Sequence, residues 1–403
     1  MPLASANRVA LGIIAESTFG TTPGSGTAKN LRYTGESFAF DLSKESSKEI
    51  RSDRQNPAPV TVDAAVSGGF NFEMQYREYD ALLEGALFNP FTVYGTDGVG
   101  SSFTATFTTT TITASVAPVG ANAFTTLQRG QFFRMTTGGV NNGKLFRVDP
   151  STDPTATVIT LDSNLPAVAG AAIANCVVQA SRLTNGVVQK FFSIEKQFLD
   201  VSQYFLYKGL CVSKLNWKFA AGALSDGSFE FMGKDGVRAG ATGLPSALAA
   251  SQPFKIQNGV RNISQLWENG APLTTTFIKS LDLTVDNNLR SQTALANLGP
   301  VGIGVGDCKV MGSATIFFSS GDQYDRFIGD TETPMVFGTQ DGLGNGYIVS
   351  LPKVTFTTAK VLAGSKNTDV MVELGFEASQ DDANATVGLR KTIFIDRVGV
   401  VAV

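Results

Sequence analysis

One ordered series of short motifs occurs twice along this chain of 403 residues. Single matches of a few residues arise by chance, but a collinear series indicates a duplicated structural unit. We therefore expect two halves of similar fold. The matched segments, first copy against second, are 41–43 (DLS) with 282–284 (DLT), 50–52 (IRS) with 289–291 (LRS), 56–60 (NPAPV) with 297–301 (NLGPV), 79–80 (YD) with 324–325 (YD), and 214–217 (KLNW) with 353–356 (KVTF).

The runs that build both halves alternate between polar and apolar residues. Examples are residues 70–76 (FNFEMQY), 215–219 (LNWKF) and 370–374 (VMVEL). Such alternation, rich in aromatic and β-branched residues, predicts strands with one buried face. The best helical candidates are residues 77–87 and 321–330, and each follows a strand-like run directly. The predicted fold class is therefore mainly β, with one flanking helix in each half.

The first half contains a long insertion after its helix. The second half reaches its next matching strand through the short Gly-rich stretch 337–347, whereas the first half has an extra segment near residues 92–186. In that segment the runs 132–136 and 144–148 flank an Asn-Gly pair, which is a strong hairpin signal. We expect a small β-domain inserted on the surface of the first half. The predicted domains are 1–91 together with 187–250, the insert 92–186, and the second half 251–403.

The chain contains no histidine, and this excludes several kinds of active site. Ser-His-Asp and Cys-His nucleophile systems and His-ligated metal sites all need that residue. Cys176, Cys211 and Cys308 lie far apart and show neither zinc-site nor disulfide spacing, so we expect buried thiols. We predict no catalytic residues, no metal and no cofactor.

Two weaker motifs have simpler structural explanations. Residues 138–145 (GGVNNGKL) approach a phosphate-binding loop, but Leu145 stands where that loop needs a Ser or Thr hydroxyl. Asp381 and Asp382 could in principle serve a glycosidase, but adjacent acids in a loop are usually just solvated. We therefore interpret residues 138–145 as a hairpin turn and Asp381 and Asp382 as part of a polar loop.

Charge and hydropathy limit the kinds of partner and the cellular location that we expect for the protein. A net charge of −3, from 32 basic and 35 acidic residues, does not suit a general polyanion-binding protein. The longest uncharged run, 98–128, is crowded with Thr, Ser, Gly and Asn and does not read as a transmembrane helix. The N-terminus does not resemble a secretory signal. We expect a soluble protein made in the cytoplasm.

The segment 44–54 (KESSKEIRSDR) alternates charges of both signs. It is either a solvated loop or an arm that docks on another subunit through paired charges. Ile50 and the prolines at 57 and 59 favour docking slightly, since they add apolar surface and stiffness. Charges at the edge of such a contact set register more than affinity. The candidate contact residues are Lys48, Glu49, Ile50, Arg51, Asp53 and Arg54, with Leu289 and Arg290 in the second copy.

The chain resembles the tail tube (major tail) proteins of long-tailed, non-contractile bacteriophages. The order of the motifs, more than any one of them, supports this resemblance, which covers most of the chain except the insert. The segments are 15–23 (AESTFGTTP), 47–54 (SKEIRSDR), 72–87, 192–196 (FSIEK) running to 209, 282–289 and 351–354 (LPKV).

The resemblance implies a β-sandwich or barrel flanked by one helix in each half. A long loop, here 42–65 and 284–309, would reach toward the neighbouring ring. Rings of such domains stack into a hollow tube through which the genome leaves the capsid. A chain with two copies would form a trimeric ring with pseudo-sixfold symmetry.

The resemblance also implies partners and a location. Besides copies of itself, the chain would meet the tape measure protein, the tail terminator and the distal tail or baseplate proteins. It would be a component of the virion tail, assembled in the host cytoplasm. DNA would cross the lumen without tight binding, which needs a neutral or acidic lining, because basic side chains retain phosphates. Candidate lining residues are Glu73, Glu230 and Glu373.

Other functions remain as alternatives. The chain could be a carbohydrate-binding virion adhesin or spike, with the Thr-rich insert as its binding module. A glycoside hydrolase is disfavoured, because no pair of acids stands out. An outer-membrane porin is disfavoured by the irregular spacing of the strands.

Overall fold

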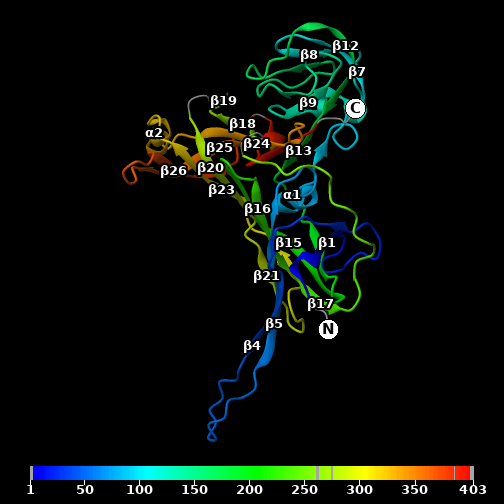
Figure 1. Ribbon diagram of the computed structural model, residues 1–403, viewed down its shortest axis with the longest axis vertical. Coiled ribbons are helices and arrows are strands. Elements are labelled where there is room, and N and C mark those ends of the chain that lie inside the picture. Colours follow the sequence, from blue (N-terminus) through cyan, green and yellow to red (C-terminus); the bar gives the residue numbers. More distant parts are fainter. Residues whose placement is uncertain (1–2, 260–262, 274–275, 385, 400–403) are drawn as a thin grey trace.

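The computed structural model describes residues 3–259, 263–273, 276–384 and 386–399. Within these residues the fold is mainly β and contains two α-helices, which confirms the predicted fold class. The strands form one large curled sheet system, a separate six-stranded sheet and a two-stranded hairpin. Figure 1 shows an elongated molecule with the six-stranded sheet at one end and a long hairpin at the other.

The first half has a continuous order of antiparallel strands. Six strands follow one another across the sheet. A seventh, β17, pairs with the first part of β15, whereas β16 pairs with the last part. The order is β4 (Ala39–Glu45), β5 (Val60–Glu73), β16 (Asp226–Gly233), β15 (Gln203–Ala220), β14 (Phe191–Phe198) and β1 (Val9–Glu16), with β17 at Asp235–Ala239.

The second half repeats this order strand for strand. Here β27 takes the place of β17, because it pairs with the starting end of β25. The duplication expected from the sequence is therefore present as a duplicated topology. The order is β20 (Ile278–Asp286), β23 (Lys309–Phe317), β26 (Met371–Ser379), β25 (Gly346–Leu362), β24 (Thr333–Gln340) and β18 (Ile263–Glu268), with β27 at Phe394–Val398.

Each half has one helix at the equivalent place in the chain, as predicted. Helix α1 (Asp80–Leu87) follows β5, and helix α2 (Asp322–Ile328) follows β23. Both are shorter than the predicted 77–87 and 321–330. Arg77 has a φ of 63° and Asp330 a φ of 47°, and residues in this left-handed region cannot belong to a right-handed helix.

The two helices pack differently. Helix α1 buries Leu82, Leu83, Ala86 and Leu87 against the sheet. In helix α2 only Gln323 is buried. Because most helix stability in proteins comes from packing of an apolar face, α2 has less support than α1 from its own chain.

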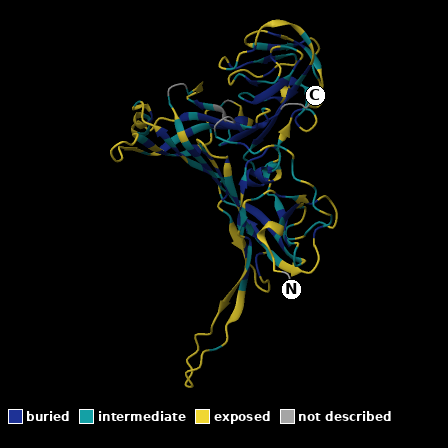
Figure 2. Cartoon of the chain, viewed as in Figure 1, coloured by how far each residue is buried: buried dark blue, intermediate teal, exposed yellow. Residues whose placement is uncertain are grey.

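Alternating burial in the strands builds a core that extends through both halves. In β15, Leu215, Trp217 and Phe219 are buried, whereas Lys218 between them is exposed. These apolar side chains belong to one cluster with Leu281 of β20 and its neighbours. Figure 2 shows this buried interior and an exposed surface along the long hairpin.

The insert forms its own six-stranded sheet around its own apolar cluster. The predicted hairpin is present: β9 pairs with β10, and Gly143 in the turn has a φ of 67°. The strands are β7 (Phe103–Phe107), β8 (Thr111–Ala114), β9 (Phe132–Thr136), β10 (Lys144–Arg147), β11 (Val158–Thr160) and β12 (Gly170–Gln179).

The insert contacts the second half as well, which differs from the expectation of a module on the first half. The Phe132 amide donates to Asp396 Oδ2 at 2.9 Å, and the Phe132 ring meets Trp267 edge-on at 5.7 Å. Residues 181–184 lie inside the predicted insert, yet they form β13 (Ser181–Thr184), which pairs with β27. Sequence pattern could not show this, because the partners are about half a chain length apart.

The remaining strands are short. They complete the edges of the large sheet and a small hairpin in the second half. They are β2 (Lys29–Asn30), β3 (Gly35–Glu36), β6 (Thr92–Val93), β19 (Ala271–Pro272), β21 (Arg290–Gln292) and β22 (Gly302–Gly304), and four single 3₁₀ turns lie at Ala6–Arg8, Gly120–Asn122, Phe124–Thr126 and Val387–Leu389.

Candidate assembly surfaces

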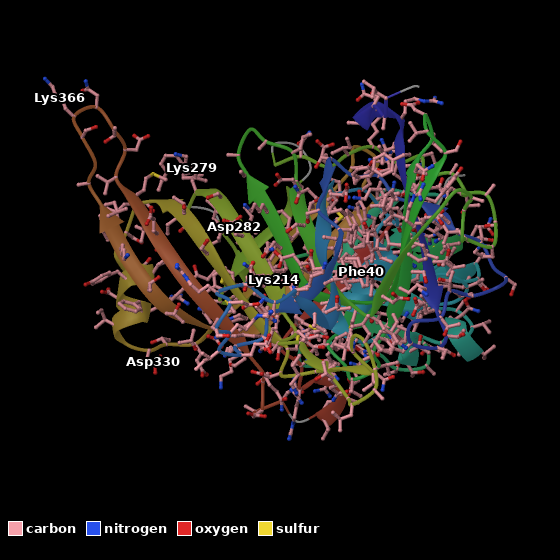
Figure 3. All side chains as sticks on the ribbon, turned by 90° about the horizontal axis from the view of Figure 1, so that it is seen from below. Phe40, Lys214, Lys279, Asp282, Asp330 and Lys366 are labelled. Carbon is pink, nitrogen blue, oxygen red and sulfur yellow. The ribbon has the colours of Figure 1, made fainter. Side chains whose placement is uncertain are left out.

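The two halves are joined by a direct pairing between β15 and β20. Trp217 lies opposite Leu283, and Lys218 lies opposite Asp282. On the polar face, Lys214 Nζ lies 3.4 Å from Asp286 Oδ2. The pairing joins β4-β5-β16-β15 and β20-β23-β26-β25 into one curved sheet, in which Phe40 of β4, Lys214 of β15 and Asp282 of β20 follow one another across the strands (Figure 3).

This sheet has two outer edges. Within the described residues, β4 pairs with β5 alone, and residues 355–362 of β25 pair with β26 alone. The equivalent strands at the internal junction, β20 and β15, pair with each other. The outer edges of one chain are therefore topologically complementary, as β20 and β15 are.

Apolar side chains on the core side of the two outer edges are exposed. At the internal junction, Phe219 lies opposite Leu281, and these side chains are only 5% and 3% exposed. At the outer edges, Val361 is 41% exposed and Leu42 is 45% exposed. Unpaired strand edges with apolar side chains favour pairing with another chain.

The opposite face of the sheet is polar and contains charges of both signs. Directly opposed residues of antiparallel strands point to the same face, so the register places Glu73, Glu230 and Glu373 together on it. The structure thus brings the three predicted lining residues onto one surface. The other charged residues there include Asp41, Asp63, Asp226, Asp282, Asp286, Glu377, Lys214, Lys218, Lys309, Lys353 and Lys360.

The charges on this face are arranged in cross-strand pairs. Lys214 lies opposite both Glu230 and Asp286, and Lys309 Nζ lies 3.7 Å from Glu377 Oε2. Exposed pairs of this kind contribute little to stability. Their effect is to keep the electrostatic potential at this face small in magnitude.

The first-half loop extends away from the molecule as a long hairpin, shown at the lower end in Figure 1. We call residues 46–59, beyond the ends of β4 and β5, the arm. The structure places all six predicted first-copy contact residues on the arm, and Ile50 is fully exposed. Arg51 Nη2 lies 2.6 Å from Asp53 Oδ2, and this hydrogen-bonded contact lowers the pKa of Asp53.

The second-half loop folds back onto the first half instead. Leu289 packs near Phe88 and Cys211, and Arg290 Nη1 donates to the Val305 carbonyl at 3.2 Å. Just before them, Asn287 Nδ2 donates to the Ala86 carbonyl in the last turn of α1. Leu289 and Arg290 are therefore engaged inside their own chain, and the structure does not bring them together with the arm.

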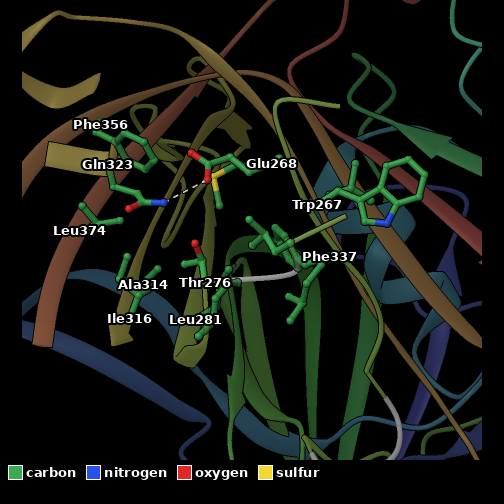
Figure 4. A pocket seen from close by; sticks show the side chains of 15 residues that line it. Trp267, Glu268, Thr276, Leu281, Ala314, Ile316, Gln323, Phe337, Phe356 and Leu374 are labelled. Atoms are coloured by element: carbon green, nitrogen blue, oxygen red, sulfur yellow. Dashed lines mark hydrogen bonds between the residues drawn. The ribbon is translucent and has the colours of Figure 1, made fainter. Parts of the chain in front are cut away.

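Other kinds of site find little support. The described residues contain no group of three Asp, Glu or Cys side chains placed to hold a metal ion. Cys176 and Cys211 are buried as predicted, whereas Cys308 is only partly buried. Burial raises the pKa of the Cys211 thiol to about 12. An apolar cavity in the second half, lined by Trp267, Phe337 and Gln323 among others, measures about 30 Å³ (Figure 4). A space of this size holds only a few water molecules and is too small for an organic ligand.

Sequence reasoning missed the two outer edges of the sheet. The match of residues 353–356 with 214–217 indicated equivalent segments, but not that the continuation of β25 through Val361 and Leu362 has no strand partner on one side. The second part of β25 contains apolar residues, Val361 and Leu362, that are exposed in the single chain. Apolar residues at the end of a predicted strand are therefore a signal for such an edge.

A comparison with protein families identifies the chain. The model of the family described as "Phage tail tube protein" matches residues 6–378. The chain belongs to this family, whose members are structural components of the phage tail. No curated protein matched the chain. In the described part of the chain, no helix has the length and apolar character needed to cross a membrane.

Proposed function

We propose that this member of the phage tail tube family assembles into trimeric rings with pseudo-sixfold symmetry, and that the rings stack into the tube through which DNA passes. The pairing of β15 with β20 supports this most directly, because it joins two equivalent units side by side in one sheet. The same pairing repeated between chains, β25 to β4, would continue the sheet around a ring.

Ring closure is favoured by the physics of strand edges. A head-to-tail contact closes into a ring when its rotation allows, and closure into a barrel leaves no free edge. The exposed Val361 and Leu42 would then be covered, as Phe219 and Leu281 are inside the chain. Each chain therefore makes one of these strand contacts internally, between β15 and β20, and leaves an equivalent contact, between β25 and β4, for neighbouring chains.

The polar face of the sheet would line the lumen. Glu73, Glu230 and Glu373 would repel phosphates there, and the paired lysines would limit the net charge. The arm, with Lys48, Glu49, Ile50, Arg51, Asp53 and Arg54, would contact the adjacent ring, and Leu289 and Arg290 would support the ring from within. No catalytic step belongs to this function.

The proposed organisation follows the sequence prediction. Residues 1–91 with 187–250 and residues 251–403 would be the two tube domains, and residues 92–186 the inserted domain. Assembly would take place in the host cytoplasm, and the tube would meet the tape measure protein, the tail terminator and the distal tail or baseplate proteins. These partners follow from family resemblance.

The experiment compares purified wild type with Val361→Asp and Leu42→Asp by light scattering and negative-stain microscopy. We expect wild type to form rings with six lobes and threefold protrusions, and both edge variants to stay monomeric and folded. Val119→Asp, at a 75% exposed position in the insert, is the matched control and should form rings. Rings from both edge variants would contradict the proposed pairing of β25 with β4 between chains.

A second role, saccharide binding at the insert, is supported by one cleft. It lies between the insert and the second half, has a volume of about 420 Å³ and is lined by Arg129, Asp149 and Asn164 among others. The buried Ser350 hydroxyl on its wall has no hydrogen-bond partner among the described residues. Glycan-array binding by the full chain, lost in Asn164→Ala, would support this role.

A further inference from the structure

One end of the sheet in the second half is apolar and exposed. We call the five residues there the apolar rim. The residues are neighbours in the sheet, because the Phe317 amide donates to the Phe277 carbonyl and the Phe318 amide to the Val370 carbonyl, each at 3.0 Å. Met371 connects it to β25, lying opposite both Phe317 and Leu362. The members and their exposures are Phe277 66%, Phe317 37%, Phe318 45%, Leu362 44% and Val370 37%.

Helix α2 begins just after the rim and is also poorly covered. Tyr324 is 42% exposed and Ile328 is 66% exposed, although both are large apolar side chains. Scattered exposed apolar residues are ordinary, but a contiguous group on a soluble chain marks a contact surface.

The equivalent end of the first half is covered by its own chain. The segment 251–259 runs along it: the Gln257 amide donates to the Met74 carbonyl at 3.0 Å, and the Gly259 amide donates to the Ala223 carbonyl at 2.9 Å. Phe254 packs edge-on against Tyr76 with ring centres 5.0 Å apart. An open rim is therefore a property of the second half alone.

The arm shows the opposite asymmetry. The first-half loop extends free of the chain, whereas the second-half loop folds back through Leu289. The arm follows the end of β4, whereas the rim includes the chain entering β20, the equivalent strand. Arm and rim therefore lie at opposite ends of the sheet, which face each other when rings stack head to tail.

The chemistry of the two surfaces is complementary. Ile50 on the arm is fully exposed, and Val60 and Val62 at its base are 65% and 51% exposed. Lys48 and Arg54 on the arm take part in no ion pair among the described residues. The same is true of the acids at helix α2, Asp322, Asp325 and Asp330, in the part of the chain that the structure describes.

We propose that the arm of each chain seats on the apolar rim of the second half of a chain in the next ring, with Ile50 on the rim and Lys48 and Arg54 beside helix α2. This rests on the proposed tube function and names the receptor of the arm. Because each chain has one free arm and one open rim, stacking has threefold rather than sixfold registry.

The test separates ring formation from stacking. Ile50→Asp and Phe318→Asp should each give rings of normal mass, with at least a tenfold loss of stacked tubes by microscopy and sedimentation. Val119→Asp is the control for an added surface charge. If Phe318→Asp lowers the melting temperature, Phe277→Asp replaces it. Normal tube yields from both the arm and the rim variants would overturn the proposal.

Cysteine cross-linking identifies the occupant. Ile50→Cys and Phe318→Cys proteins, mixed and oxidised, should form a heterodimer in tubes but not in isolated rings. Disulfides of Cys-substituted position 318 with itself, or a heterodimer in isolated rings, would show a different occupant and overturn the proposal. Absence of rings in wild type would instead contradict the proposed function on which this inference rests.

Discussion

Arg182 and Asp396 form a bidentate ion pair in the interior, with Arg182 Nε and Nη2 each 2.7 Å from one carboxylate oxygen. The two side chains are 3% and 0% exposed. Asp396 also accepts the Phe132 amide, and Arg182 Nη1 donates to the Arg129 carbonyl at 3.1 Å. One pair thus connects β27 of the second half with β9 and the chain entering it in the insert.

Loss of one partner of this pair should be strongly destabilising. Arg182→Met leaves the buried Asp396 carboxylate without its counterion, which costs about 3–5 kcal/mol of unfolding free energy. The double variant Arg182→Met/Asp396→Leu removes both charges and should recover most of that loss. Urea denaturation of the two variants measures the difference. A double variant as unstable as the single one would contradict this account.

The cysteine thiols should be unreactive in the folded protein. Burial raises the pKa of Cys176 above its ordinary value and that of Cys308 to about 11, so few thiolates form at pH 8. Iodoacetamide should modify the native chain at least tenfold more slowly than the chain in guanidinium. Rapid labelling of Cys308 in the native state, followed by peptide mass spectrometry, would contradict this expectation.

Glu78 should make stability depend on pH. Burial raises the pKa of Glu78 above its ordinary value, although its carboxylate accepts the Gln252 amide at 2.8 Å. A raised folded-state pKa means that the folded state binds the proton more tightly, so this contribution favours folding at low pH. It is lost as pH rises from the unfolded to the folded pKa.

Glu78→Gln should therefore be more stable than wild type at pH 8, and the difference should disappear near pH 4. Melting temperatures of both proteins across that range provide the measurement. The neutral amide keeps an acceptor for the Gln252 N–H. A variant less stable than wild type at pH 8 would show that the hydrogen bond outweighs desolvation.

Reversal of charge on the polar face should slow DNA passage in the proposed tube. Glu230→Lys places a cation opposite Lys214, and a basic lining binds phosphates. We expect assembled tails but at least tenfold slower DNA release from virions. Asp153→Lys in the insert is the matched control, since that side chain is 61% exposed and paired only with Arg129 among the described residues. Unchanged release would argue against a lumen position for Glu230.

Sequence reasoning succeeded where the signal is local. The period-two runs, both helices and the β9–β10 hairpin depend on neighbouring residues, and the structure confirms them. The environment of a motif depends on distant partners. Ile50-Arg51-Ser52 and Leu289-Arg290-Ser291 have nearly the same sequence, yet Ile50 is exposed and Leu289 packs beside Phe88.

The contact of the insert with the second half shows the same limit. Phe132 and Asp396 are 264 positions apart in sequence, and a pattern search over short windows cannot relate them. Alternation places Glu73, Glu230 and Glu373 on the polar side of their own strands, but it does not show that the three strands share one sheet. The free edge of β25 was missed, because an unpaired strand has the same periodicity as a paired one.

The internal pairing of β15 with β20 changes the expected kinetics of assembly. This pairing forms when the chain folds. The effective concentration of one strand near the other is set by the linker between them rather than by the amount of protein. In the proposed trimer, half of the contacts around a ring then need no encounter between molecules. Nucleation of a ring would follow a lower power of subunit concentration than in a hexamer of single domains, so tubes can begin to grow earlier in an infection.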